Sequence, residues 1–164
     1  PIVFACANPV PEIYPSEAKA AGAYIVATGR GDFPNQVNNS LGFPGILKGA
    51  LLVRARKITD EMAIAAAHSL ASFAEKKGLS PDYIIPKMDE AEVFPTEARD
   101  VAMQAIKDGV ARVTMTPEEA FKRAESDIKE ARHIVHQMME MGLIKKPPMD
   151  LLEAAVKRAV AQVK

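Results

Sequence analysis

Uncharged amide side chains are concentrated at two places in the first quarter of the chain. Asn8 directly follows an apolar run, and the segment 35–39 contributes further amides that include Asn38 and Asn39. An amide donates and accepts hydrogen bonds without adding charge, so such side chains suit the recognition of a carboxylate or a carboxamide. Asparagine also serves turns and helix caps, and the residue types alone leave both interpretations open.

The flanking sequence predicts where these amides lie. The run 2–7 is continuously apolar and predicts a strand buried on both faces, as in a parallel sheet. Because Pro9 restricts Asn8 to an extended backbone, the Asn8 side chain is expected at the carboxyl edge of the sheet, where open α/β folds bind ligands. A short helix at 15–21 and a second strand at 23–28 complete a βαβ unit, which predicts an α/β fold.

Helical patterns follow the second strand. Asn38 or Asn39 is expected to cap the next helix, which Pro44 either kinks or opens. Thr59 is expected to cap the helix after it, which ends at Gly78. Further helices are predicted at 95–107, 117–141 and 151–163.

The helix 117–141 has the clearest signals. Thr116 and Glu119 form a capping box at its start. One apolar stripe runs along it, made of Phe121, Ala124, Ile128, Ala131, Val135 and Met138.

No other catalytic pattern stands out. The chain has neither a G-x-G-x-x-G nor a Walker A segment. His133 and His136 are three residues apart and could share a helix face, but they flank the apolar stripe, which favours surface histidines over a metal pair. Cys6 lies within the apolar run "IVFACA" and is expected to be a buried structural thiol.

The bulk composition narrows the class of protein. The 164 residues carry 21 basic and 21 acidic side chains, so net charge gives no reason to expect a nucleic acid or an anionic membrane as partner. No apolar run reaches the length of a membrane span. A single cysteine excludes an intrachain disulfide, which favours a reducing compartment and hence the cytoplasm. A buried strand with no lead-in indicates the later part of a longer protein.

Three ordered segments carry a resemblance. "PIVFACANPVPEI", "GAYIVATGRGDFPNQVNN" and "FPGILKGALLVRARKITDEMAIAAAHSLA" resemble the later part of the nucleotide-binding domain of malic enzymes of the short prokaryotic type. The segment "VFPTEARDVAMQAIKDGVAR" continues the resemblance, which covers about residues 1–112 closely. It implies that residues 1–112 are the C-terminal part of a Rossmann-like, parallel-sheet NAD(P)-binding domain, and that residues 113–164 are a helical C-terminal extension.

The resemblance also implies an activity. Malic enzymes oxidise (S)-malate with NAD or NADP and decarboxylate the product to pyruvate and CO2, with Mg or Mn. By resemblance, Asn8 and Asn39 contact the substrate, and Asn8 and Asn38 contact the cofactor. The family's catalytic tyrosine and lysine, its acidic metal ligands and its dinucleotide glycines have no counterpart here, so no catalytic or metal residue is assigned. The expected partners are the N-terminal part of the same enzyme and a second copy in a homodimer, and the isolated segment is expected to be inactive.

Two alternatives stay open. The chain could be a non-catalytic helical or assembly fragment whose long helix mediates oligomerisation. It could also belong to another oxidative decarboxylase of a hydroxy acid, although the "PNQVNN" segment resembles malic enzymes more closely.

Overall fold

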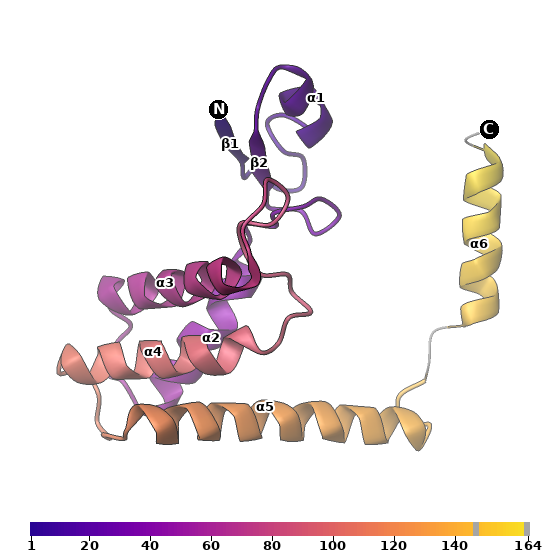
Figure 1. Cartoon of the computed structure of the whole chain (residues 1–164). Coiled ribbons are helices and arrows are strands. Elements are labelled where there is room, and N and C mark those ends of the chain that lie inside the picture. The colour runs from indigo at the N-terminus through magenta and orange to yellow at the C-terminus, as the bar shows by residue number, and fades with distance from the viewer. Residues whose placement is uncertain (146–147, 163–164) are drawn as a thin grey trace. The chain divides into compact units, whose positions relative to one another are not determined.

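The structure is a computed structural model that describes residues 1–145 and 148–162. The chain divides into two compact units, Pro1–Glu125 and Ser126–Lys164. Figure 1 shows the elements along the chain. In order they are β1 (Ile2–Ala5), α1 (Pro15–Ala20), β2 (Ile25–Thr28), α2 (Asn39–Leu52), α3 (Asp60–Lys77), α4 (Val93–Lys107), α5 (Pro117–Glu140) and α6 (Met149–Gln162).

The sheet of the first unit is a parallel pair. β1 and β2 run side by side in a register that joins Ile2 to Ile25 and Ala5 to Thr28. α1 lies between them in the sequence, so the predicted βαβ unit and the α/β fold class are confirmed. Because both strands run in the same direction, their carboxyl ends meet at one edge of the sheet.

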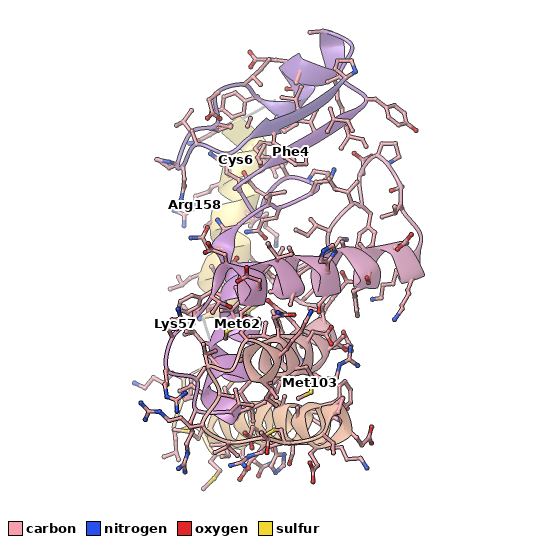
Figure 2. The ribbon with its side chains drawn as sticks, turned by 90° about the vertical axis from the view of Figure 1, so that its left-hand side faces the viewer. Phe4, Cys6, Lys57, Met62, Met103 and Arg158 are labelled. Carbon is pink, nitrogen blue, oxygen red and sulfur yellow. The ribbon has the colours of Figure 1, made fainter. Side chains whose placement is uncertain are left out.

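The burial predicted for the first strand is wrong. Ile2 and Phe4 are 64% and 56% exposed, and the strand ends at Ala5. Cys6 is exposed as well, not a buried structural thiol (Figure 2). Side chains alternate along an extended chain, so Ile2, Phe4 and Cys6 share one side, and the described chain does not cover it.

Three helices form the core beneath the sheet (Figure 1). α2, α3 and α4 pack against one another. Glycines let α2 approach α4 closely, because a Cβ atom at Gly49 would lie 2.6 Å from the carbonyl oxygen of Ala98. One core cluster, to which the start of α5 also contributes, comprises Leu52, Val53, Met62, Ala66, Ala98, Val101, Ala102, Ala105, Ala120 and Ala124.

Most predicted helix starts are confirmed. The Thr59 hydroxyl accepts a hydrogen bond from the Met62 backbone at 3.2 Å. Thr116 and Glu119 exchange the two hydrogen bonds of a capping box. α4 begins at Val93, two residues before the predicted start. Pro95 then sits in the first turn, where a missing backbone N–H costs no helical hydrogen bond.

The second unit holds the end of α5 and all of α6. α6 begins at Met149, two residues before the predicted start, and the predicted last residue, Val163, lies outside the described residues. His133 and His136 are exposed, as expected for surface histidines, and His136 pairs with Glu140 at 3.0 Å. None of the helices in residues 1–145 and 148–162 is long and apolar enough to span a membrane.

Candidate functional site

The carboxyl ends of both strands meet at Gly29, the residue that follows β2. Its carbonyl oxygen accepts a hydrogen bond of 2.9 Å from the Asn38 side chain. A Cβ atom at Gly29 would lie 3.5 Å from the carbonyl oxygen of Cys6, the residue that follows β1. The sheet edge and the entrance to α2 therefore form one local structure.

Asn38 holds the entrance of α2 in place. Its Oδ1 accepts a hydrogen bond of 3.0 Å from the Ser40 backbone, while its Nδ2 donates to Gly29. The amide thus caps the helix and ties it to the end of β2. Of the two asparagines expected as the cap, Asn38 has this role; its predicted contact with the cofactor stays a prediction.

Asn39 is the first residue of α2, and its side chain is exposed. Within the described part of the chain, its amide makes no hydrogen bond. The first turn of α2 contains no acidic residue, so its free backbone N–H groups face no carboxylate of their own turn. Asn39 can therefore present both an amide and the positive end of a helix to an anionic group.

Asn8 lies in the loop that follows β1. It is exposed, and its peptide bond to Pro9 is cis. The Arg30 guanidinium donates to the Pro9 carbonyl oxygen at 3.2 Å and also pairs with Asp32 at 2.7 Å. The loop after β1 is thus tied to the loop after β2. This tie limits the positions open to the Asn8 amide.

Asn35 is a structural residue. It is buried, and its backbone has a φ of 56°. Its Nδ2 donates to the carbonyl oxygens of Val26 at 3.1 Å and Pro81 at 2.8 Å, and its Oδ1 accepts from the Ile84 backbone at 2.9 Å. These bonds use the whole amide to join β2 to the loop before α4.

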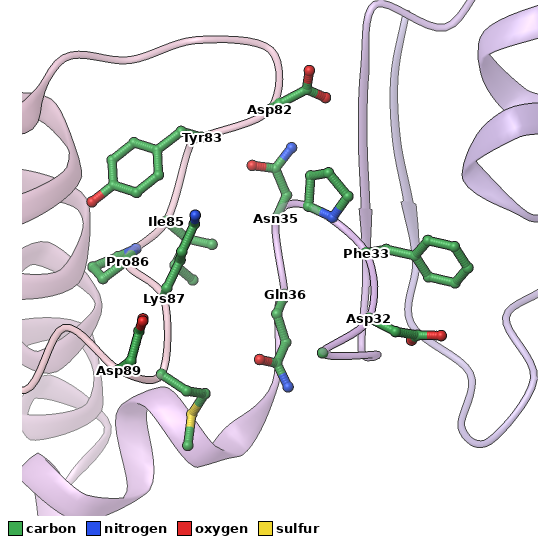
Figure 3. Close-up of a pocket in the computed structure, with 13 residues that line it drawn as sticks. Asp32, Phe33, Asn35, Gln36, Asp82, Tyr83, Ile85, Pro86, Lys87 and Asp89 are labelled. Atoms are coloured by element: carbon green, nitrogen blue, oxygen red, sulfur yellow. The ribbon is translucent and has the colours of Figure 1, made fainter. Parts of the chain in front are cut away.

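A pocket of about 590 Å³ lies between the two loops that Asn35 joins (Figure 3). Asn8, Asn38 and Asn39 do not line it. The sequence pattern did not predict it, because its walls come from segments about fifty residues apart. It is lined by Gly31, Asp32, Phe33, Pro34, Asn35, Gln36, Asp82, Tyr83, Ile85, Pro86, Lys87, Met88 and Asp89.

The tyrosine beside this pocket is unsuited to proton transfer. The Tyr83 hydroxyl donates to the Glu90 carboxylate at 3.0 Å. Burial, together with this hydrogen bond, raises the pKa of Tyr83 to about 12, so the phenol stays protonated near neutral pH. Glu90 also pairs with Lys77, and the group acts as a brace between α3 and the following loop.

The described residues contain no group of three or more His, Cys, Asp or Glu side chains placed to hold a metal ion. The exposed groups proposed for ligand contact at the sheet edge, Asn8 and Asn39, are uncharged amides. Such groups orient a polar substrate, and they do not themselves accept a proton from it.

Comparison with known proteins shows the family to which the chain belongs. A family model described as "Malic enzyme, NAD binding domain" matches residues 1–110. The chain belongs to the malic enzyme family. The match covers both strands, Asn8, the amides of segment 35–39, and the helices α2, α3 and α4.

Relatives from three organisms illustrate the similarity. The bifunctional malic/malolactic enzyme of Bacillus subtilis is 54% identical over 123 residues, which are 75% of this chain and 30% of that protein. The crystal structure of Entamoeba histolytica malic enzyme matches all of this chain and 34% of its own, with a TM-score of 0.93 and 65% identity. The malic enzyme structure from Pyrococcus horikoshii matches 84% of this chain and 31% of its own, with a TM-score of 0.78 and 52% identity.

The family relationship confirms the predicted resemblance and the α/β class. The chain spans about a third of the length of these three malic enzymes.

Proposed function

We propose that this chain is the segment of a malic enzyme that orients malate against the nicotinamide cofactor. The full-length enzyme oxidises (S)-malate with NAD or NADP and decarboxylates the product to pyruvate and CO2. The observation that carries the proposal is the match of residues 1–110 to the NAD-binding domain of malic enzymes, in which the exposed Asn39 amide opens α2 at the carboxyl edge of the sheet.

Each amide has its own part in the proposed site. The Asn39 amide and the start of α2 hold a malate carboxylate, because an amide N–H and the positive helix end both favour an anion. Asn8, from the loop after β1, contacts the substrate and the cofactor carboxamide. Asn38 anchors α2 through its cap and the bond to Gly29, and it also lies beside the cofactor.

The nicotinamide accepts the hydride when it is bound. The proposed metal, Mg or Mn, takes its ligands from outside this chain, and no step is derived through it. The chain also depends on the rest of the enzyme for its catalytic acid and base, so residues 1–164 alone are inactive. We further propose that the enzyme is a cytoplasmic homodimer.

Single substitutions in the full-length enzyme test the amide roles. We expect Asn39→Ala and Asn8→Ala each to lower kcat/KM for malate by roughly tenfold or more, because a hydrogen bond to a charged group contributes about 1.5–3 kcal/mol. Gln137→Ala removes an exposed amide on α5 and serves as the matched control. Unchanged kcat/KM in both asparagine variants would contradict the assignment.

A second experiment addresses the alternative of a non-catalytic fragment. Residues 1–164 should not reduce NAD or NADP with malate, whereas the full-length protein should do so. If the full-length protein also fails with malate and both cofactors, the assembly alternative becomes the better account.

A further inference from the structure

One buried carboxyl group has no part in the site described above. Glu97 lies on α4 and is completely buried, and within the described residues neither of its carboxyl oxygens has a hydrogen-bond partner. The helices of the described fold already enclose it, so its environment is set by this chain. A carboxyl group in such a place is tolerated when it is neutral and is costly when it is ionised.

The Glu97 side chain lies against the first two turns of α2. A Cβ atom at Gly45 would overlap its carboxyl group, and a Cβ atom at Gly42 would lie 3.8 Å from its Oε1. α2 begins at Asn39 and packs along α4 (Figure 1). The contact is therefore close to the Asn39 amide along the helix, on the side of α2 that faces α4.

The start of α2 depends on contacts from outside the helix. Pro44 lies within α2 and has no backbone N–H, so the carbonyl oxygen of Ser40, four residues earlier, lacks its helical hydrogen bond. The Asn38 cap stabilises the first turn from its amino end. Packing on Glu97 is the contact that fixes how close these turns lie to α4.

The charged side chains of the neighbouring helices do not neutralise Glu97. Its oxygens have no bonded partner among the described residues, and burial alone raises its pKa to about 8. Asp100, on the same helix, bonds instead to Ser69 and Arg99. An ionised Glu97 is thus a buried anion without a counter-ion. The charged or titratable residues on these helices are Lys48 on α2; Asp60, Glu61, His68, Glu75, Lys76 and Lys77 on α3; Arg99, Asp100 and Lys107 on α4; and Glu118, Glu119, Lys122 and Arg123 at the start of α5.

We propose that Glu97 is a positioning residue for malate binding: its buried carboxyl holds the first two turns of α2 in place on α4 and thereby sets the position of the Asn39 amide. The neutral carboxyl packs directly against the glycine backbone. When it ionises, the first turns of α2 move away from α4 to admit water, because an unpaired buried charge is unstable. The link to malate rests on the function proposed above for Asn39, whereas the packing of α2 on Glu97 does not.

The direction of the pH effect follows from the two forms. In the packed form the pKa of Glu97 is about 8, and in the opened form, where water reaches the carboxyl, it returns to the ordinary 4.5. The packed form therefore binds the proton more tightly. Its advantage is fully present at low pH and is lost as pH rises from about 4.5 to about 8, so opening of α2 increases by at most about tenfold per pH unit.

Hydrogen exchange of the full-length enzyme tests the packing without any substitution. Mass spectrometry at pH 6, 7 and 8 gives protection factors, which correct for the intrinsic effect of pH on exchange. We expect protection of the amides in segment 41–47 to fall at least about tenfold from pH 6 to pH 8, and to fall less in α3. Constant protection in segment 41–47, or an equal fall in α3, would overturn the proposal.

A matched pair of variants assigns the effect to one carboxyl. Glu97→Gln keeps the shape of the side chain without a charge and should abolish the loss of protection in segment 41–47. Glu92→Gln makes the same change at an exposed position at the start of α4, where the side chain makes no cap hydrogen bond, and should retain the loss. A Glu97→Gln enzyme that loses protection as the unsubstituted enzyme does would overturn the proposal.

Malate kinetics test the link to Asn39. Between pH 6.5 and pH 8.5, the KM for malate of the unsubstituted enzyme should rise at least about threefold relative to that of Glu97→Gln. The ratio of the two kcat values should change less than about twofold, because bound malate selects the packed form. A constant KM ratio would overturn the link to malate. If Asn39→Ala leaves kcat/KM unchanged, the proposed function fails, and the exchange experiment still decides whether Glu97 positions α2.

Discussion

The carboxyl group of Glu97 on α4 lies directly against the backbone of Gly45 on α2, so closely that a Cβ atom at Gly45 would overlap it. Glu97 is completely buried, and within the described residues neither of its carboxyl oxygens has a hydrogen-bond partner. Burial raises the pKa of Glu97 to about 8. The contact therefore joins the helix that carries Asn39 to a carboxyl group that is mostly protonated at neutral pH.

Gly45→Ala should destabilise the protein by about 1–3 kcal/mol, because the added methyl group overlaps the Glu97 side chain. Gly42→Ala is the matched control on the same helix. A Cβ atom there would lie 3.8 Å from Glu97 Oε1, an ordinary van der Waals distance, and alanine favours the helix by about 0.5–1 kcal/mol. Urea denaturation of both variants measures the difference. Equal midpoints would show that α2 can shift to make room.

Glu97→Gln should remove part of the dependence of stability on pH. The pKa of Glu97 is about 8 in the folded protein against an ordinary 4.5, so the folded state binds the proton more tightly. Its stabilising contribution is present at low pH and is lost as pH rises from about 4.5 to about 8, with a slope of at most about 1.4 kcal/mol per pH unit.

Denaturation at pH 5.5, 7 and 8.5 measures this slope. The unfolding free energy of the unsubstituted protein should fall more steeply with pH than that of Glu97→Gln. Glu61→Gln, at an exposed position on α3, is the control and should leave the slope unchanged. Parallel pH curves for all three proteins would exclude a titrating Glu97 in this range.

Substitution of Asn35 should separate its side-chain bonds from its backbone conformation. Asn35→Gly keeps a residue that accepts the φ of 56° but removes three hydrogen bonds, at a cost of at least about 2 kcal/mol. Asn35→Ala should cost about 1–2 kcal/mol more, because alanine is strained at positive φ. Thermal unfolding of the two variants measures both the loss of the side-chain hydrogen bonds and the backbone strain of alanine at positive φ. An alanine variant more stable than the glycine variant would contradict that strain.

Substitution of Asn38 should lower stability, whereas substitution of Asn39 should lower activity and leave stability nearly unchanged. Asn38→Ala loses the cap and the bond to Gly29 and should lower stability by at least about 1 kcal/mol. Asn39→Ala removes an exposed side chain from a helix and should leave stability within about 0.5 kcal/mol. Paired unfolding curves and malate assays on the full-length enzyme check this division. A large loss of stability in Asn39→Ala would show that Asn39 has a structural role and would contradict this division.

Local patterns were enough for most of the fold. Thr59 and Thr116 cap helices where their sequence contexts predict, and the Asn38 cap is one of the two that the pattern allowed. Such signals are reliable because a cap bonds to backbone only two or three residues away. The α4 start differs by two residues, since Pro95 is as acceptable in the third helical position as in the first.

Burial was less predictable. The apolar run 2–7 indicated a strand covered on both faces, yet Phe4 and Cys6 are exposed in this chain. Conversely, nothing in the sequence around Glu97 indicates that this charged residue is completely buried. Whether a side chain is covered depends on which distant segments pack over it, and residue type records only the average outcome.

By itself, the sequence determined the parallel βαβ unit, most of the helix starts, the family resemblance and the amides that follow each strand, because these depend on neighbouring residues and on ordered motifs. Only the tertiary structure decided that Asn38 ties α2 to Gly29 and that Asn35 joins β2 to the loop before α4. It also decided that, among the described residues, Asn39 makes no side-chain hydrogen bond and Glu97 has no hydrogen-bond partner where it lies against Gly45. Each of these depends on contacts between residues that are distant in the chain, where backbone and side chains must fit in three dimensions.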